Sequence, residues 1–323
     1  MTKPISSRAR RTYFNNPLVE ESLLHLSAAV DHSTSMEFRE YLEKQLHHNS
    51  QKTRGRFAQY IAQRFSHDGV MNRDLARAIA RFGDSRVGRE ILYFEMLRAA
   101  PLLQEIASLW LAEVPPQGVA RSALLSFLEP RLGGRSADRV AQAAVATFRR
   151  CNKLSSPKLA IYHSVWSEPP IEAFCYALAI LYPERTMVKV DLFAGTPILR
   201  AMLWPQPGIE GLLKQAEQLG HISKISQLDQ YHQFTLADTG QERLALLFGE
   251  QKTETANVAP PLRLVPLPTV TSATKKSVPL IPAKSEPEKR AAASKSTKKR
   301  GNGAGTGGTR DFWFMRKERT FSK

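Results

Sequence analysis

The apolar periodicity of this chain stops near Gln251, and that boundary decides how much of the sequence can form a fold. From Gln251 to Lys323 the residues are mostly proline, lysine, alanine, serine, threonine and glycine, without helical or strand spacing. Such a segment buries too little apolar surface to offset the entropy that the chain loses on ordering. We therefore predict a disordered tail over residues 251–323 and a fold built from the residues before it.

The net charge is concentrated in this predicted tail. The chain has 46 Lys and Arg against 30 Asp and Glu, which gives a formal net charge of +16. Residues 251–323 contain about 16 basic and about 5 acidic residues, so about two thirds of the excess lies there. The cluster Lys298, Lys299 and Arg300 is expected to attract DNA or RNA without regard to sequence. The alternative is that this segment is a solubilising linker, which would have a similar composition.

Residues 17–154 have the spacing of amphipathic helices with recognisable starts and stops. Thr34 and Glu37 have the capping-box spacing, and Ser50 is placed to begin a helix that carries Phe57 and Ile61 on one face. Gly83 stands where a helix should end. About seven helices with short connections predict a compact helical domain.

A junction rich in serine and proline, residues 155–169, separates this domain from a second one at 171–250. There the pattern predicts a helix at 171–181, a strand at 187–193, helices at 197–203 and 209–219, and a short hairpin over 222–236. A last helix is expected at 241–248. Helix, strand, two helices and a hairpin is the order of a winged helix-turn-helix.

Basic residues of the body recur at helical spacing. They could contact DNA phosphates, or they could simply form a solvated face. The candidates are Lys52, Arg54 and Arg56 at a helix start, Arg73, Arg77 and Arg81 at strict four-residue spacing, and Lys224 in the hairpin.

Two further candidate segments lie at the ends of the chain. Residues 1–16 form a basic arm with Arg8, Arg10 and Arg11 for nucleic acid, or else a frayed terminus. Phe312, Trp313 and Phe314 follow the basic tail and are predicted to dock a partner protein.

No pattern of a catalytic, cofactor or metal site is found. Ala194-Gly195-Thr196 lacks the further glycine and lysine of a phosphate loop, and the eight histidines are scattered. We therefore predict a protein that is not an enzyme, with no cofactor, metal or small-molecule substrate. The two cysteines are too few for a disulfide framework, and no signal peptide or membrane span is evident, which predicts a cytoplasmic protein.

Three segments carry a resemblance to a known family: 49–57 (NSQKTRGRF), 89–103 (REILYFEMLRAAPLL), and the helix from Ser136 that ends in Asn152-Lys153-Leu154. Over roughly residues 16–240 the chain resembles the BrxA family of BREX bacteriophage-defence systems. The resemblance implies a NusB-like helical fold, DNA binding without known catalysis, and other defence-system proteins as partners. It points to Lys52, Arg54 and Arg56 as the first DNA contacts.

Together these observations predict a non-catalytic subunit that binds double-stranded DNA or another nucleic acid and contributes to an assembly. The alternative is a protein scaffold whose terminal aromatic peptide docks a larger partner, with the basic stretches serving only as solvated faces.

Overall fold

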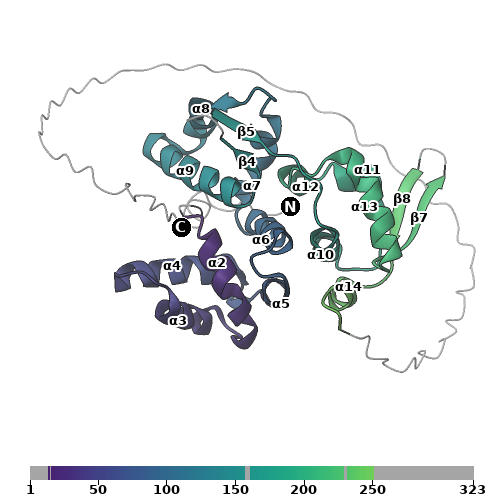
Figure 1. Ribbon diagram of the computed structural model, residues 1–323, viewed down its shortest axis with the longest axis horizontal. Helices are drawn as coiled ribbons and strands as arrows, with labels where there is room; N and C mark the ends of the chain where they lie inside the picture. The colour runs from purple at the N-terminus through teal and green to yellow at the C-terminus, as the bar shows by residue number, and fades with distance from the viewer. Residues whose placement is uncertain (1–13, 15, 157–160, 229–230, 251–323) are drawn as a thin grey trace, which may run out of the picture. The chain divides into compact units, whose positions relative to one another are not determined.

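The computed structural model describes residues 14, 16–156, 161–228 and 231–250, which all belong to one compact unit, Met1–Val258 (Figure 1). The described chain is mainly helical with small antiparallel sheets, as the sequence predicted. The tail at 251–323, with Lys298, Lys299, Arg300, Phe312, Trp313 and Phe314, and the arm with Arg8, Arg10 and Arg11 lie outside the described residues.

The first group of elements ends at residue 82 and consists of α2 (Val19–His25), η1 (Leu26–Asp31), α3 (Ser35–Gln45), α4 (Gln51–Arg64), β1 (Ser66–His67), β2 (Val70–Met71) and α5 (Arg73–Phe82). The predicted capping box is present, because the Thr34 hydroxyl accepts from the Glu37 N–H and the Glu37 carboxylate accepts from the Thr34 N–H, both at 3.2 Å. Gly83 ends α5 with a φ of 54°, as predicted.

The middle group consists of α6 (Arg86–Ala99), α7 (Pro101–Leu109), η2 (Leu111–Glu113), β3 (Val119–Ala120), α8 (Arg121–Leu132), α9 (Gly134–Arg150), β4 (Leu154–Ser155) and β5 (Ile161–Ser164). The predicted junction at 155–169 thus contains a strand, since β5 pairs antiparallel with both β3 and β4.

The last group consists of α10 (Ile171–Leu181), β6 (Met187–Lys189), α11 (Val190–Ala194), α12 (Pro197–Ala201), α13 (Gln206–Gln218), β7 (Ile222–Leu228), β8 (Tyr231–Leu236) and α14 (Gly240–Leu247). The strand predicted at 187–193 is wrong in its second half, which forms α11. Val190 and Phe193 are buried three residues apart there, while Leu192 is 68% exposed, so the local pattern follows a helix.

One topology occurs three times along the chain. Each occurrence has a leading helix, an extended segment, a helix pair and two further strands, and the last strand pairs with both the extended segment and the strand before it. The extended segment is a strand in the second and third occurrences (β3 and β6) and the single bridging residue Thr34 in the first, and in the third the short helix α11 precedes the helix pair. The sheet orders are β3-β5-β4 and β6-β8-β7, and in the first group β2 pairs with β1 while its Val70 bridges Thr34. We name these segments repeat A (19–71), repeat B (101–164) and repeat C (171–236).

Repeat C has the helix, strand, helix pair and hairpin that the sequence predicted for a winged helix, with α11 added between the strand and the helix pair. Repeats A and B have the same order within the region for which only helices were expected. Their strands are two to four residues long, which is too short to show an alternating pattern.

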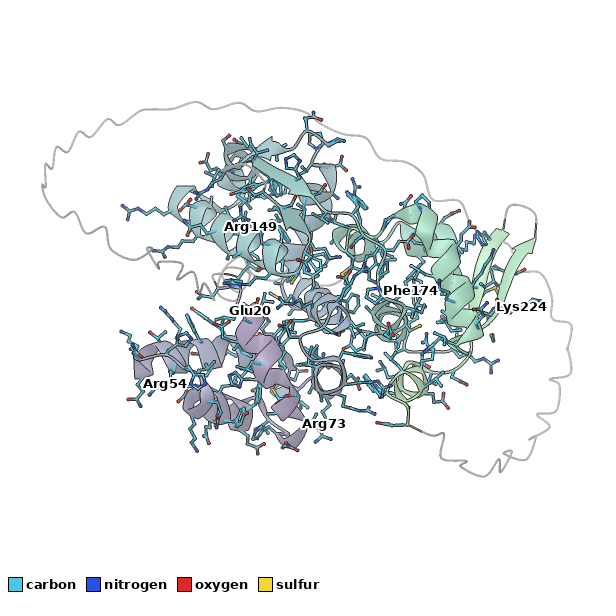
Figure 2. The ribbon with its side chains drawn as sticks, in the orientation of Figure 1. Glu20, Arg54, Arg73, Arg149, Phe174 and Lys224 are labelled. Carbon is cyan, nitrogen blue, oxygen red and sulfur yellow. The ribbon has the colours of Figure 1, made fainter. Side chains whose placement is uncertain are left out.

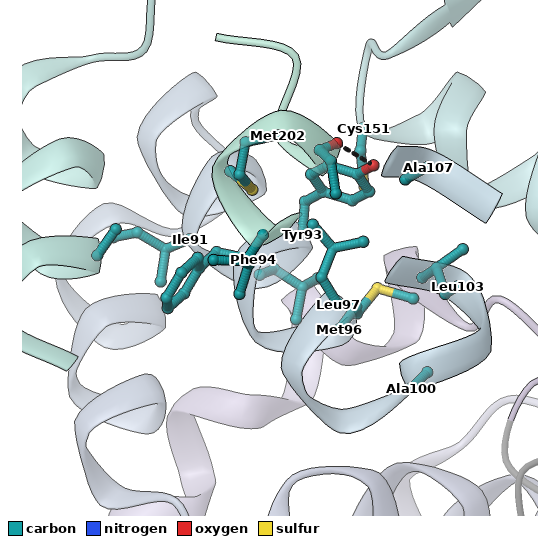
Figure 3. Packing of buried hydrophobic residues seen from close by; sticks show 14 of the residues in the cluster. Ile91, Tyr93, Phe94, Met96, Leu97, Ala100, Leu103, Ala107, Cys151 and Met202 are labelled. Atoms are coloured by element: carbon teal, nitrogen blue, oxygen red, sulfur yellow. Dashed lines mark hydrogen bonds between the residues drawn. The ribbon is translucent and has the colours of Figure 1, made fainter. Parts of the chain in front are cut away.

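Helix α6 lies between the repeats and forms the centre of the core. It packs against α2, α5, α7, α10 and α12, and Ile91 to Leu97 are buried without interruption. Figure 3 shows Ile91, Tyr93, Phe94, Met96 and Leu97 with Leu103 of α7 and Met202 after α12. The Tyr93 hydroxyl donates to the Ala201 carbonyl at 3.0 Å. Buried residues before and after the junction therefore share one hydrophobic cluster.

A buried ion pair also joins repeats B and C to α6. Lys153, which follows α9, places its Nζ 2.5 Å from Oε1 of Glu90 and donates to the Met202 carbonyl at 2.8 Å. The Trp204 indole donates to the same Glu90 oxygen at 2.6 Å. Lys153 is 1% and Glu90 6% exposed, so these contacts satisfy charges that have little access to water.

A second buried carboxylate, Glu95, joins α6 to α5 and α10. It accepts from Tyr176 at 3.0 Å, from Arg98 at 2.8 Å and from the Asn72 amide at 3.2 Å. Burial raises the pKa of Glu95 despite the neighbouring Arg98 guanidinium. Both buried acids thus fix the position of α6 against its neighbours.

Candidate nucleic-acid interface

The helix pair in each repeat is where a helix-turn-helix protein would meet DNA. The pairs are α3–α4 in repeat A, α8–α9 in repeat B and α12–α13 in repeat C. In such proteins the second helix of the pair lies in the major groove, and its first residues contact the bases. The first two turns of α4, α9 and α13 are therefore the positions to compare.

In α4 the predicted residues Lys52 and Arg56 are exposed, whereas Arg54 is half-buried. Figure 2 labels Arg54 on this helix. Arg54 donates from Nη1 to the His48 carbonyl at 2.6 Å, which holds the turn between α3 and α4. It also lines a hollow of about 610 Å³, together with Glu40, Glu43 and Lys44. Lys52 and Arg56 are thus available to a polyanion, while Arg54 has an internal structural contact.

The three arginines of α5 do not form one free stripe. Arg77 lies 4.6 Å from the centre of the Phe248 ring and pairs with Glu250, and Arg81 donates to the Phe248 carbonyl at 2.7 Å. These contacts attach the end of α14 to α5. Arg73 is exposed and has no partner among the described residues, so the prediction of phosphate contact narrows to Arg73 on this helix.

Repeat C has little positive charge on its helix pair. The exposed face of α13 carries Glu210, Lys214 and Glu217, and Glu217 accepts from the Ile225 N–H at 3.1 Å. Lys224 is exposed on β7, as expected for a backbone contact, but the adjacent helix offers carboxylates to an approaching phosphate.

Sequence reasoning missed Arg135 and Arg139 on α9. Both are exposed in the first two turns of the second helix of repeat B. Their four-residue spacing is visible in the sequence, and Asp138 lies beside Arg139. The structure shows that the Asp138 carboxylate accepts from Arg121 at 2.6 Å and from Gln142 at 2.8 Å, so its charge is already paired.

Comparison with solved structures gives a likeness of fold. A crystal structure of SspB matches 75% of this chain and 88% of its own, with 12% sequence identity and a TM-score of 0.51. A magnesium-bound SspB crystal structure matches with the same identity and coverage and a TM-score of 0.48. The chain shares the SspB fold. At this identity the likeness concerns the fold alone, and no family model and no curated protein matches the chain.

Three further observations concern the described part of the body. Burial raises the pKa of the Cys151 and Cys175 thiols to about 12. Within the described ranges, no group of three or more His, Cys, Asp or Glu is arranged to hold a metal ion, and no helix there combines the length and apolar character needed to cross a membrane.

Proposed function

We propose that this chain is a non-catalytic, cytoplasmic subunit that binds double-stranded DNA through the start of α4. The observation that supports this most directly is the exposure of Lys52 and Arg56 on the first two turns of that helix. The helix is the second of a pair and is followed by a hairpin, which is where DNA-binding winged helices carry their contact residues.

Charge and spacing agree with a phosphate contact at this position. Residues four apart lie on one helix face, so the Lys52 ammonium and the Arg56 guanidinium can reach neighbouring phosphates of one strand. Each neutralised phosphate releases counterions, and the slope of log K against log salt changes by about 0.9 for each contact. Loss of both side chains should therefore flatten the slope by about 1.8.

The cellular setting in this proposal comes from the resemblance to the BrxA family. This resemblance implies that the chain belongs to an assembly with other proteins of a bacteriophage-defence system. Binding that depends mainly on phosphates would hold such an assembly on DNA without selecting a sequence.

The test is a gel-shift salt titration of the full-length protein and of K52A/R56A on one duplex. We expect the variant to bind more weakly at low salt and to show the flatter slope. Because the predicted tail carries about two thirds of the net charge, a chain ending at Val258 is measured in parallel, after circular dichroism has shown that it is folded. Equal slopes for wild type and variant in both lengths would contradict the proposed site on α4.

The second candidate function is a protein scaffold. The observation in its favour is the acidic character of α13, where Glu210 and Glu217 occupy the helix that would otherwise face DNA. The terminal segment Phe312-Trp313-Phe314 is its predicted docking peptide. If deletion of residues 309–323 leaves every partner bound in a pull-down, that peptide has no docking role.

A further inference from the structure

The exposed arginines of α9 occupy the same place in repeat B as the proposed DNA contacts occupy in repeat A. We propose that Arg135 and Arg139 form a second phosphate-binding site, so that one DNA duplex contacts repeats A and B together. This inference rests on the proposed function and names a further part of the DNA-binding surface.

The correspondence is positional. Helix α4 begins at Gln51, so Lys52 and Arg56 are its second and sixth residues. Helix α9 begins at Gly134, so Arg135 and Arg139 are also second and sixth. In α13, which begins at Gln206, these two positions are Pro207 and Gly211. Repeats A and B thus share a cationic pair that repeat C lacks.

Packing does not explain why arginine is present on this face of α9. The opposite side of the helix buries Val140, Ala144 and Phe148, while Arg135 and Arg139 are exposed and have no carboxylate partner among the described residues. Many other arginines of the body do have one: Arg39, Arg77, Arg89, Arg98, Arg121, Arg131 and Arg200. Guanidinium groups without a carboxylate partner remain able to form charge-assisted hydrogen bonds with the phosphates of a nucleic-acid backbone.

Repeats A and B are connected directly, which fixes the two helices in one arrangement. Glu20 on α2 pairs with Arg89 of α6 at 3.0 Å and lies 3.8 Å from Arg150 at the end of α9. Helix α2 also packs against both α6 and α9. Because both cationic pairs lie on one preformed body, the second pair can contact the same duplex with little further loss of conformational entropy. The second contact therefore raises the affinity for that duplex.

A salt titration can count these contacts. If all four cations reach phosphates, the two pairs contribute equally, about 1.8 each to the slope. Between about 50 and 200 mM salt, the affinity of R135A/R139A should fall about tenfold less than that of the wild type.

The experiment measures binding of the full-length protein to a duplex of about 30 base pairs by fluorescence anisotropy at several salt concentrations. The variants are K52A/R56A, R135A/R139A, the fourfold variant, and R135K/R139K, which keeps the charge. The matched control is R185A/K214A, which removes two exposed cations from repeat C. Thermal unfolding should be unchanged in all of them, because the substituted side chains are exposed.

We expect R135A/R139A to flatten the slope by about 1.8 and the fourfold variant by about 3.6, while the lysine variant and the control keep the wild-type slope. If R135A/R139A keeps the wild-type slope while K52A/R56A flattens it, the second site is refuted and the proposed function stands. If R135A/R139A is the only double variant that flattens the slope, the site on α9 is supported and the site on α4 is wrong. If the full-length protein does not bind, or binds an RNA duplex of equal length more tightly, both proposals fail.

Discussion

Replacement of Lys153 by methionine tests whether the buried ion pair holds repeats B and C against α6. Methionine fills a similar volume without the charge, so the Glu90 carboxylate stays buried and, among the described residues, keeps the Trp204 indole as its hydrogen-bond donor. Removing one partner of a buried pair costs about 3–5 kcal/mol, because the remaining charge is uncompensated. For a domain of this size we expect the midpoint of thermal unfolding to fall by roughly 6–20 °C.

The assay is urea unfolding followed by circular dichroism, with E90Q/K153M as the second variant. Glutamine keeps an oxygen that can accept from Trp204 but removes the buried charge, so the double variant should recover most of the lost stability. K214M, on the exposed face of α13, is the matched control and should stay within about 0.5 kcal/mol of the wild type. If K153M costs under about 1 kcal/mol, or if E90Q/K153M is the less stable of the two variants, our account of this pair is wrong.

Three other substitutions test separate parts of the body. His221 is 3% exposed, and burial beside Arg243 lowers its pKa to about 4. Below about pH 6.5 the imidazole takes up a proton in the unfolded chain but not in the folded one. The free energy of unfolding should therefore fall by up to about 1.4 kcal/mol per pH unit as the pH drops from about 6.5 towards 4. Urea unfolding of H221Q across this range should show a shallower fall, and a slope equal to the wild type would contradict the assignment. At Gly240 a Cβ would lie 2.4 Å from the Ala179 carbonyl oxygen, so G240A should lower the free energy of unfolding by about 1–3 kcal/mol. At Gly211 a Cβ would meet no atom within 4 Å, so G211A should stabilise α13 by about 0.5–1 kcal/mol. Thermal unfolding of both checks this, and a G240A midpoint at or above that of the wild type would refute the packing of α14 on α10.

The features of the fold that sequence predicted are those set by neighbouring residues. The Thr34–Glu37 capping box and the glycine that ends α5 depend on contacts three or four positions apart, and both are present. The strands of repeats A and B were missed because they are very short, and part of their pairing is distant in sequence, as in the bridge between Thr34 and Val70 and the pair Val119 and Tyr162. A strand of two residues has no period to detect.

The same distinction applies to the candidate interface. The sequence shows which residues are cationic, and the exposure of Lys52 and Arg56 follows from the amphipathic pattern of α4. It does not show which cations already have partners. Arg77 and Arg81 meet residues 173 and 167 positions away, and those contacts depend on how α14 packs on the body. The resemblance to BrxA stays a prediction.

The sheet order in the repeats also determines how the protein can form during synthesis. In each repeat the strand made last pairs with the two extended segments made before it, so those segments have no partner until residues near 71, 164 and 236 have left the ribosome. Helix α6 contacts elements of all three repeats, including α10 and α12. A nascent chain must therefore keep part of the helix at the centre of its core uncovered for about a hundred further residues, which is when it is most open to chaperones and to misassembly.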